Sequence, residues 1–232
     1  MNFPILSTVI FLPLLGSLFI FLSKSQNKNQ SYVYVSLFTS MANLFLSIFL
    51  WYSFDENYSG FQFIEDHDWI SGFIKFKLGI DGISILFIVL TAFITPICII
   101  SCINSVKDRV KEFLIAILIL ETFMIGVFCS LDLVIFYLFF EAGLIPMFLI
   151  IGVWGGQRRV YSAFKFFLFT LLGSVLMLVA IISIYWITGT TDVTEIYQLK
   201  IPKEFQNLLW LAFFSSFAVK MPMWPVHTWL PD

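Results

Sequence analysis

The sequence has few charged residues. Only 12% of its 232 residues are Asp, Glu, Lys or Arg, whereas 59% are hydrophobic, and the mean hydropathy is +0.94. A soluble domain carries roughly twice this charged fraction. The composition therefore excludes a water-soluble globule and makes the bilayer the expected solvent. The net charge of -2 also excludes a basic surface for nucleic acid.

The chain also lacks the motifs of metal, disulfide and cofactor sites. Its three cysteines, Cys98, Cys102 and Cys129, fall in apolar stretches, form no CxxC pair and have no accompanying histidine. We interpret each as a small apolar residue. The sequence contains no GxGxxG, P-loop or haem motif, so we expect no cofactor and no metal in this chain. If the protein serves an oxidoreductase, the electrons travel elsewhere.

A secretory signal is missing as well. Residues 1–23 contain no charge, so no basic region precedes the first apolar run, and Pro4 and Pro13 lie within it. We interpret this segment as a first spanning helix.

Long apolar runs fill most of the sequence. A bilayer span needs about 20 mostly apolar residues. Seven stretches qualify, and they predict an all-α, polytopic integral membrane protein of about seven transmembrane helices: residues 3–22, 32–53, 82–103, 113–130, 132–153, 161–187 and 206–225. Ser130-Leu131-Asp132 is expected to form the turn between the fourth and fifth helices. Residues 54–80, the longest connection, contain Trp69 and Phe76 and are expected to lie partly at the interface.

The basic residues between the spans predict the orientation. The loops after odd-numbered spans contain seven Lys or Arg residues, including Lys24, Lys107 and Arg158, against four in the other loops. Cytoplasmic loops are enriched in Lys and Arg. We therefore expect the N-terminus outside and residue 232 inside.

Four ionisable residues fall inside the predicted spans: Glu121, Glu141, Lys165 and Lys220. A charge at the centre of a spanning helix costs about 2.5–3.5 kcal/mol on the insertion scale, so such residues are functional candidates by default. At 1.5 Å per residue, Glu141 lies roughly 13 Å from the outer face and Glu121 roughly 15 Å from the inner face. Lys220 lies roughly 21 Å from the outer face if its helix is straight.

The sequence after Lys220 predicts a break in that last helix. Pro222 and Pro225 follow closely, and proline removes a backbone donor and clashes with the preceding turn. Broken helices beside ionisable residues are typical of transporters. A break would also bring Lys220 closer to the depth of Glu141.

Each candidate has a structural alternative. Lys165 is close enough to the inner loop to extend its ammonium to the headgroups. Glu121 could form a hydrogen bond between helices without carrying protons, and Glu141 with Lys220 could be a static ion pair. His227, after the last span, is by itself more typical of a loop residue.

Several segments resemble one family. Residues 140–156, FEAGLIPMFLIIGVWGG, and 220–232, KMPMWPVHTWLPD, resemble the subunit M family of proton-pumping NADH:quinone oxidoreductase, respiratory complex I, whose mitochondrial counterpart is subunit 4. Residues 78–84 and 164–181 are similar in position and order. The resemblance extends over essentially the whole chain.

The resemblance implies a membrane subunit that translocates protons, coupled to electron transfer from NADH to quinone. It implies that Glu141 pairs with Lys220 and modulates its proton affinity, and that Glu121 and His227 match family positions. It also implies an antiporter-like fold, with three helices over residues 1–111 and the start of the translocating repeat over 112–232. NADH, quinone, FMN and iron–sulfur clusters belong to other subunits. The implied partners are the antiporter-like subunits L and N in a bacterial inner membrane, or alternatively a mitochondrial one.

One departure from the family concerns length. Family members are about twice as long, with around fourteen helices and two inverted repeats. We therefore expect this chain to be the N-terminal half of such a subunit, as a fragment or as a split or truncated product. A sodium–proton antiporter subunit, a membrane hydrogenase subunit and a non-functional truncated fragment remain as alternatives.

Overall fold

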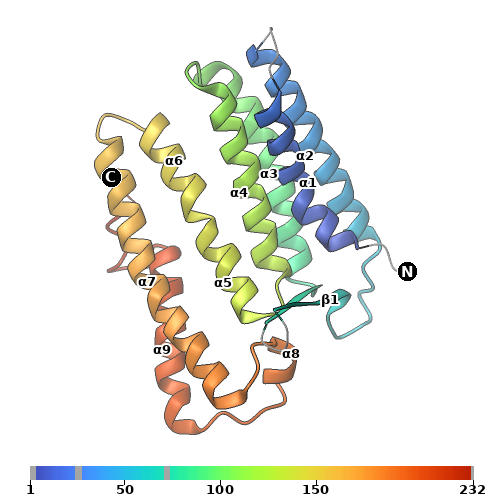
Figure 1. Cartoon of the computed structure of the whole chain (residues 1–232), viewed down its shortest axis with the longest axis vertical. Helices are drawn as coiled ribbons and strands as arrows, with labels where there is room; N and C mark the ends of the chain where they lie inside the picture. The colour runs from blue at the N-terminus through green and yellow to red at the C-terminus, as the bar shows by residue number, and fades with distance from the viewer. Residues whose placement is uncertain (1–3, 24–27, 71–73, 231–232) are drawn as a thin grey trace. The chain divides into compact units, whose positions relative to one another are not determined.

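The structure is a computed structural model that describes residues 4–23, 28–70 and 74–230. Two residues named above lie outside the described residues. They are Lys24, one of the basic residues that predict the orientation, and Asp232, the last residue of the segment 220–232 that resembles the family. The chain divides into two compact units (Figure 1). Unit 1 comprises residues 1–67 and 76–130, and unit 2 comprises residues 68–75 and 131–232.

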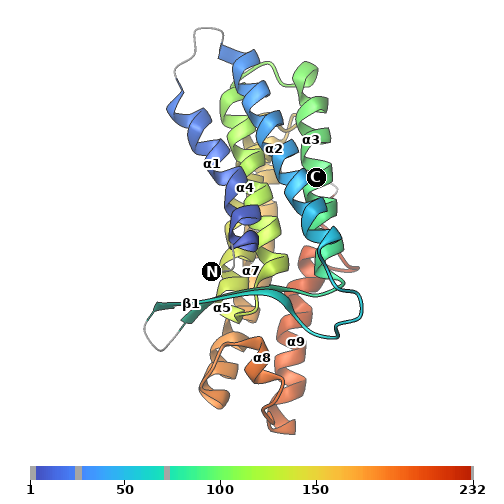
Figure 2. The same ribbon diagram turned by 90° about the vertical axis from the view of Figure 1, so that its right-hand side faces the viewer.

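Unit 1 is a bundle of four long helices. In Figure 2 α1, α2, α3 and α4 run alongside one another. Each helix contacts its neighbours in the sequence, and α1 and α4 also contact each other. Their bounds are α1 Ile5–Leu22, α2 Lys28–Tyr52, α3 Ser84–Ser105 and α4 Val110–Cys129. Each is apolar around most of its circumference, as expected where one face meets lipid and the other meets protein.

Charged side chains from elsewhere in unit 1 cap both ends of α1. At its start, the Glu65 carboxylate accepts hydrogen bonds from the backbone N–H groups of Leu6 at 2.8 Å and Ser7 at 3.1 Å, and from the Ser7 hydroxyl. At its end, Lys111 Nζ donates to the carbonyls of Phe21 at 2.8 Å and Ser23 at 3.2 Å. An anion at the N-terminus and a cation at the C-terminus both match the helix dipole.

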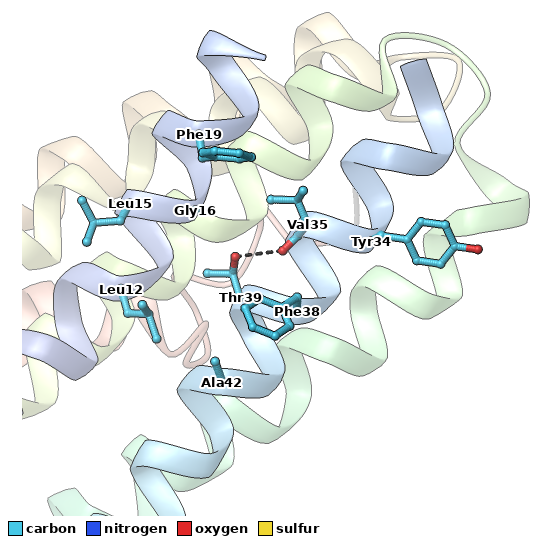
Figure 3. A pocket seen from close by; sticks show the side chains of 9 residues that line it. All are labelled: Leu12, Leu15, Gly16, Phe19, Tyr34, Val35, Phe38, Thr39 and Ala42. Atoms are coloured by element: carbon cyan, nitrogen blue, oxygen red, sulfur yellow. Dashed lines mark hydrogen bonds between the residues drawn. The ribbon is translucent and has the colours of Figure 1, made fainter. Parts of the chain in front are cut away.

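A glycine allows α1 to approach α2 closely. A Cβ atom on Gly16 would lie 2.5 Å from Thr39 Cγ2, nearer than real contacts allow. Beside this crossing an apolar groove opens between the two helices (Figure 3), in which the Thr39 hydroxyl donates to the carbonyl of Val35 at 2.8 Å. The described residues that line the groove include no Asp, Glu, Lys, Arg or His.

The long connection between the second and third spans forms a β-hairpin. Strand β1 is Gln62–Ile70 and strand β2 is Ile74–Ile80, and together they make a two-stranded sheet. The aromatic residues of this segment predict an interfacial location, and the strands are a feature that the sequence prediction did not include. Its carboxyl end leads into Asp81, whose carboxylate accepts hydrogen bonds from the N–H groups of Ile83 at 3.1 Å and Ser84 at 2.7 Å at the start of α3.

Unit 2 contains the remaining helices. They are α5 Leu133–Ala142, α6 Leu144–Trp154, α7 Arg159–Thr188, α8 Val193–Ile196 and α9 Lys203–Lys220. The long helices α7 and α9 lie side by side (Figure 1), and α6 also contacts α7. A Cβ atom on Gly173 of α7 would lie 3.1 Å from Val219 of α9, so the absence of a side chain there permits the close packing.

The buried Asp132 accepts several hydrogen bonds at the start of unit 2. Asp132 accepts hydrogen bonds from the N–H groups of Val134 at 2.8 Å and Ile135 at 3.2 Å, and from the Thr191 hydroxyl at 2.5 Å. An N-cap aspartate satisfies donors that have no partner within the helix. The predicted polar junction at Ser130-Leu131-Asp132 is confirmed, since α4 ends at Cys129 and α5 begins at Leu133.

The predicted spans agree well with these helices. Six segments within the described part of the chain are long and apolar enough to cross a membrane, with α5 and α6 counted together as Leu133–Trp154. The seventh predicted span corresponds to α9, whose 18 residues include Lys203, Glu204 and Lys220. This helix ends at Lys220, five residues before the predicted limit. The mainly helical membrane fold is thus confirmed, while the division at residues 111 and 112 stays a prediction.

Candidate functional site

Glu141 lies in unit 2, where the fifth span is interrupted. Helix α5 ends at Ala142, one residue after Glu141, and α6 begins at Leu144. Pro146 has no N–H group to donate to the carbonyl of Ala142, four residues earlier. The proline therefore explains why the helix changes direction next to the glutamate.

The Glu141 carboxylate has no hydrogen-bond partner among the residues that the structure describes, although both of its oxygens are buried. The Ser174 hydroxyl of α7 lies near it but donates to the carbonyl of Leu171 at 2.9 Å. A buried carboxylate without partners is costly, and such groups in native proteins call for an explanation.

Lys220 is directed at the same short segment. Its Nζ donates to the carbonyl of Phe140 at 3.0 Å and lies 4.0 Å from the centre of the Phe140 ring. The carbonyl belongs to the residue directly before Glu141. Among the described residues the Glu141 oxygens have no hydrogen-bond partner, and the Lys220 ammonium is held by the carbonyl and the aromatic ring of the preceding residue.

The predicted break after Lys220 is confirmed. Pro222 cannot donate to the carbonyl of Ala218, and Met223 N–H donates to it instead at 2.8 Å. The Trp229 indole N–H donates to the carbonyl of Val219 at 2.9 Å. Carbonyls released by a broken membrane helix need such partners. The chain after α9 therefore folds back and completes the end of the helix that carries Lys220.

The Phe140 ring that Lys220 contacts belongs to a cluster of aromatic rings. Phe217 of α9 makes edge contacts with Phe136 at 6.4 Å and Phe140 at 6.1 Å, and Phe136 stacks on Phe140 at 5.7 Å between ring centres. In such apolar surroundings a charge interacts more strongly with its neighbours than in water.

The other sequence candidates lie apart from these contacts. Lys165 of α7 has its Nζ 6.0 Å from the centre of the Tyr161 ring, one turn earlier on the same helix. His227 lies in the segment after α9, and its Nδ1 is buried without a hydrogen bond in the described part of the chain. Among the candidates in the described part of the chain, Lys220 is thus linked to the segment of Glu141 through its hydrogen bond to the Phe140 carbonyl.

Glu121 belongs to unit 1, and its hydrogen-bond partner was not among the residues predicted from the sequence. Asn43 of α2 donates from Nδ2 to Glu121 Oε1 at 2.8 Å, and both side chains are buried. The side-chain amide of Asn43, in the middle of an apolar span, could have indicated this contact. The residues described by the structure include no cluster of three His, Cys, Asp or Glu side chains that could hold a metal ion.

Comparisons with known proteins identify relatives. Residues 130–232 match the family model described as NADH:quinone oxidoreductase/Mrp antiporter, TM. The chain is 50% identical to NADH-quinone oxidoreductase subunit M of Rhodobacter capsulatus, over 98% of this chain and 47% of that protein. It is 49% identical to NADH-ubiquinone oxidoreductase chain 4 of Marchantia polymorpha, over 98% of this chain and 46% of that protein. The chain thus spans about half the length of these relatives.

Solved structures show the same fold. A chain of respiratory complex I from Thermus thermophilus with bound NADH superposes with a TM-score of 0.85 at 26% identity, covering 97% of this chain and 46% of that one. A chain of the archaeal membrane-bound sulfane sulfur reductase has a TM-score of 0.81 at 24% identity, covering 98% and 36%. The second likeness concerns the fold alone.

Proposed function

We propose that this chain, which belongs to the NADH:quinone oxidoreductase and Mrp antiporter family of membrane proteins, forms part of a proton-translocating subunit of respiratory complex I. The observation that carries the proposal is the placement of Lys220 on the Phe140 carbonyl, beside the unpartnered carboxylate of Glu141. Its relatives are named as subunits of NADH-quinone and NADH-ubiquinone oxidoreductases.

The chemistry assigned to the pair is the loading and release of a proton on Lys220. A nearby carboxylate favours a charged lysine, whereas apolar surroundings favour the neutral amine. When Glu141 is ionised, Lys220 binds a proton. When the Glu141 charge moves away or is neutralised, the same lysine releases it. Because no hydrogen bond fixes the Glu141 oxygens, little structure must be broken for this change.

The oxidoreductase activity would belong to the assembly. NADH, FMN, iron–sulfur clusters and quinone would be bound by other subunits, and this chain would act as their partner in the membrane arm, next to antiporter-like subunits L and N. The membrane would be a bacterial inner membrane or a mitochondrial inner membrane, since relatives of both kinds exist. His227, with its buried Nδ1, is a further candidate for proton exchange near Lys220, and Lys165 is a candidate at the start of α7.

The test is the substitution of Lys220 in a full-length version of the subunit within the assembled complex. We expect Lys220→Ala to abolish NADH-driven acidification of inverted membrane vesicles and to reduce quinone reduction strongly. Lys203→Ala, at the exposed start of the same helix, is the matched control and should pump normally. Normal pumping by the Lys220→Ala complex would refute the proposal.

A sodium–proton exchange function is the second candidate, because the matching family model includes Mrp antiporters. Sodium-dependent proton flux, measured in vesicles without NADH or quinone, would favour it. Flux that requires NADH oxidation and is indifferent to sodium would favour the complex I role.

A further inference from the structure

Glu121 and Asn43 are joined by one hydrogen bond, and each side chain has a second polar atom without a described partner. Glu121 on α4 is 2% exposed and Asn43 on α2 is 0% exposed, and a 2.8 Å hydrogen bond joins Asn43 Nδ2 to Glu121 Oε1. The remaining oxygens, Glu121 Oε2 and Asn43 Oδ1, are also buried. Neither accepts a hydrogen bond from any residue that the structure describes. Two acceptor oxygens of one joined pair therefore lack a donor.

The neighbouring hydroxyl groups do not supply this donor. Ser40 and Ser47 share the buried side of α2, but they donate to the carbonyls of Leu37 at 3.1 Å and Leu44 at 2.8 Å. Thr122, next to Glu121, donates to the carbonyl of Leu118 at 3.3 Å. Each hydroxyl proton is thus used within its own helix.

Among the residues that the structure describes, no cation stands against the Glu121 carboxyl to balance a negative charge. Helices α1 and α3 contain no Asp, Glu, Lys, Arg or His, and α2 contains only Lys28, fifteen residues before Asn43. On α4 itself Lys111 is ten residues away, roughly 15 Å along the helix, and binds the end of α1. Acids at the ends of these helices include Glu112, at the start of α4, Glu65, at the start of α1, and Asp81, before α3.

The other titratable groups on these helices do not balance the charge either. They are the tyrosines of α2 and the cysteines of α3 and α4, and a phenol or thiol is not a cation in either protonation state: Tyr32, Tyr34, Tyr52, Cys98, Cys102 and Cys129. An ionised Glu121 would therefore be an isolated buried charge, which proteins avoid.

We propose that Glu121 is a proton-binding site in which Oε2 holds a proton and donates it to Oδ1 of Asn43, closing a cyclic carboxylic acid–carboxamide pair between α2 and α4. This arrangement gives each of the two remaining oxygens a role, one as donor and one as acceptor, and needs no counter-charge. The proton is a permanent part of the packing of unit 1. In Figure 2 the two helices that it joins run next to one another.

Infrared spectroscopy of the full-length protein in its complex tests the proton directly. The difference spectrum between the parent and Glu121→Gln should contain the C=O band of a protonated, hydrogen-bonded carboxylic acid, constant between about pH 5 and 8. Asn43→Leu removes the acceptor and should shift this band to higher frequency. A carboxylate band in place of the acid band, or an acid band that disappears within this pH range, would overturn the proposal.

A swapped pair separates the proton from simple helix packing. The double variant Asn43→Asp, Glu121→Gln places the acid on α2 and the amide on α4. We expect it to regain the acid band and to have a higher Tm than Asn43→Leu by several degrees. If Asn43→Leu fails to fold, the swapped pair and Glu121→Gln still decide, because a swapped pair with only a carboxylate band contradicts the proposal.

Discussion

Glu121 and Glu141 are both carboxyl groups within apolar helices, but they lie in differently built units. Glu121 shares a hydrogen bond with Asn43 and has no basic residue against it on the neighbouring helices of unit 1. The Glu141 carboxylate accepts no hydrogen bond from the residues that the structure describes, and unit 2 brings the Lys220 ammonium to the carbonyl directly before it. The helix that carries Glu121 is continuous, whereas those that carry Glu141 and Lys220 are interrupted by Gly143 and Pro222.

This difference teaches what makes a buried carboxyl suitable for proton transfer. A group fixed by a neutral partner has one stable protonation state, because any change would leave an uncompensated charge. A group beside a lysine has two states of similar energy, since either partner can hold the proton. Under the proposed function, proton exchange belongs to unit 2, whereas the Glu121–Asn43 pair contributes to the packing of unit 1.

The largest expected effect compares the two glutamates. We expect Glu141→Gln to reduce NADH-driven proton pumping by at least about ten-fold, which corresponds to about 1.4 kcal/mol, because the amide cannot attract the Lys220 proton. Glu121→Gln should lose far less, since a glutamine can still pair with Asn43. Proton pumping in inverted vesicles and the rate of quinone reduction measure the loss of activity in each variant. Equal losses in the two variants would break the comparison.

A smaller effect is expected from repairing the interrupted helix. Pro222→Ala restores an N–H group that can donate to the Ala218 carbonyl, so α9 should extend beyond Lys220 and displace the Met223 and Trp229 hydrogen bonds. We expect turnover to fall by roughly three- to ten-fold, or about 0.7–1.4 kcal/mol, while the complex still assembles. Pro202→Ala, before the first turn of α9, is the control. Unaltered turnover in Pro222→Ala would show that the break is dispensable.

In unit 1 substitutions should change stability more than turnover. Glu65→Ala removes the acceptor from the first N–H groups of α1, which should cost about 1 kcal/mol. Hydrogen exchange provides the measurement, because the Leu6 and Ser7 amides should exchange faster than in the parent. Glu56→Gln, an exposed acid in the same unit, should leave these amides protected. Unchanged exchange in Glu65→Ala would mean that Glu65 does not cap α1.

The sequence predicted which charged residues are buried better than it predicted the residues that contact them. Apolar length alone located the spans, since bilayer thickness fixes how many residues a helix needs. Burial cost identified Glu121, Glu141 and Lys220, and the prolines predicted the break after Lys220. The contact of Lys220 with the Phe140 carbonyl could not be predicted, because it depends on helix rotation. For Glu121 the amide of Asn43 was a signal, but the sequence alone does not give the rotation that pairs the two side chains. The β-hairpin was missed because aromatic residues occur both in interfacial segments and in strands.

The smallest expected effect tests whether exposed charges contribute to unit 2. Glu195 is 3.3 Å from Lys75 Nζ and accepts a 2.7 Å hydrogen bond from the Thr190 hydroxyl. The Thr190 and Lys75 hydrogen bonds lower the pKa of Glu195 from its ordinary value of 4.5. Its stabilisation is therefore fully present above pH 4.5 and is lost as the pH falls through the lower folded-state pKa. Because the pair is exposed, we expect no more than about 0.5 kcal/mol.

Thermal unfolding of the parent and Glu195→Gln over a series of pH values measures this contribution. The two Tm curves should be slightly apart near neutral pH and should meet below pH 4.5, where the parent carboxylate becomes protonated. Glu204→Gln, an exposed acid at the start of α9, controls for the change in net charge. A Tm difference that persists at low pH would have to come from packing. A difference that disappears in high salt as well would confirm that a screened charge pair causes it.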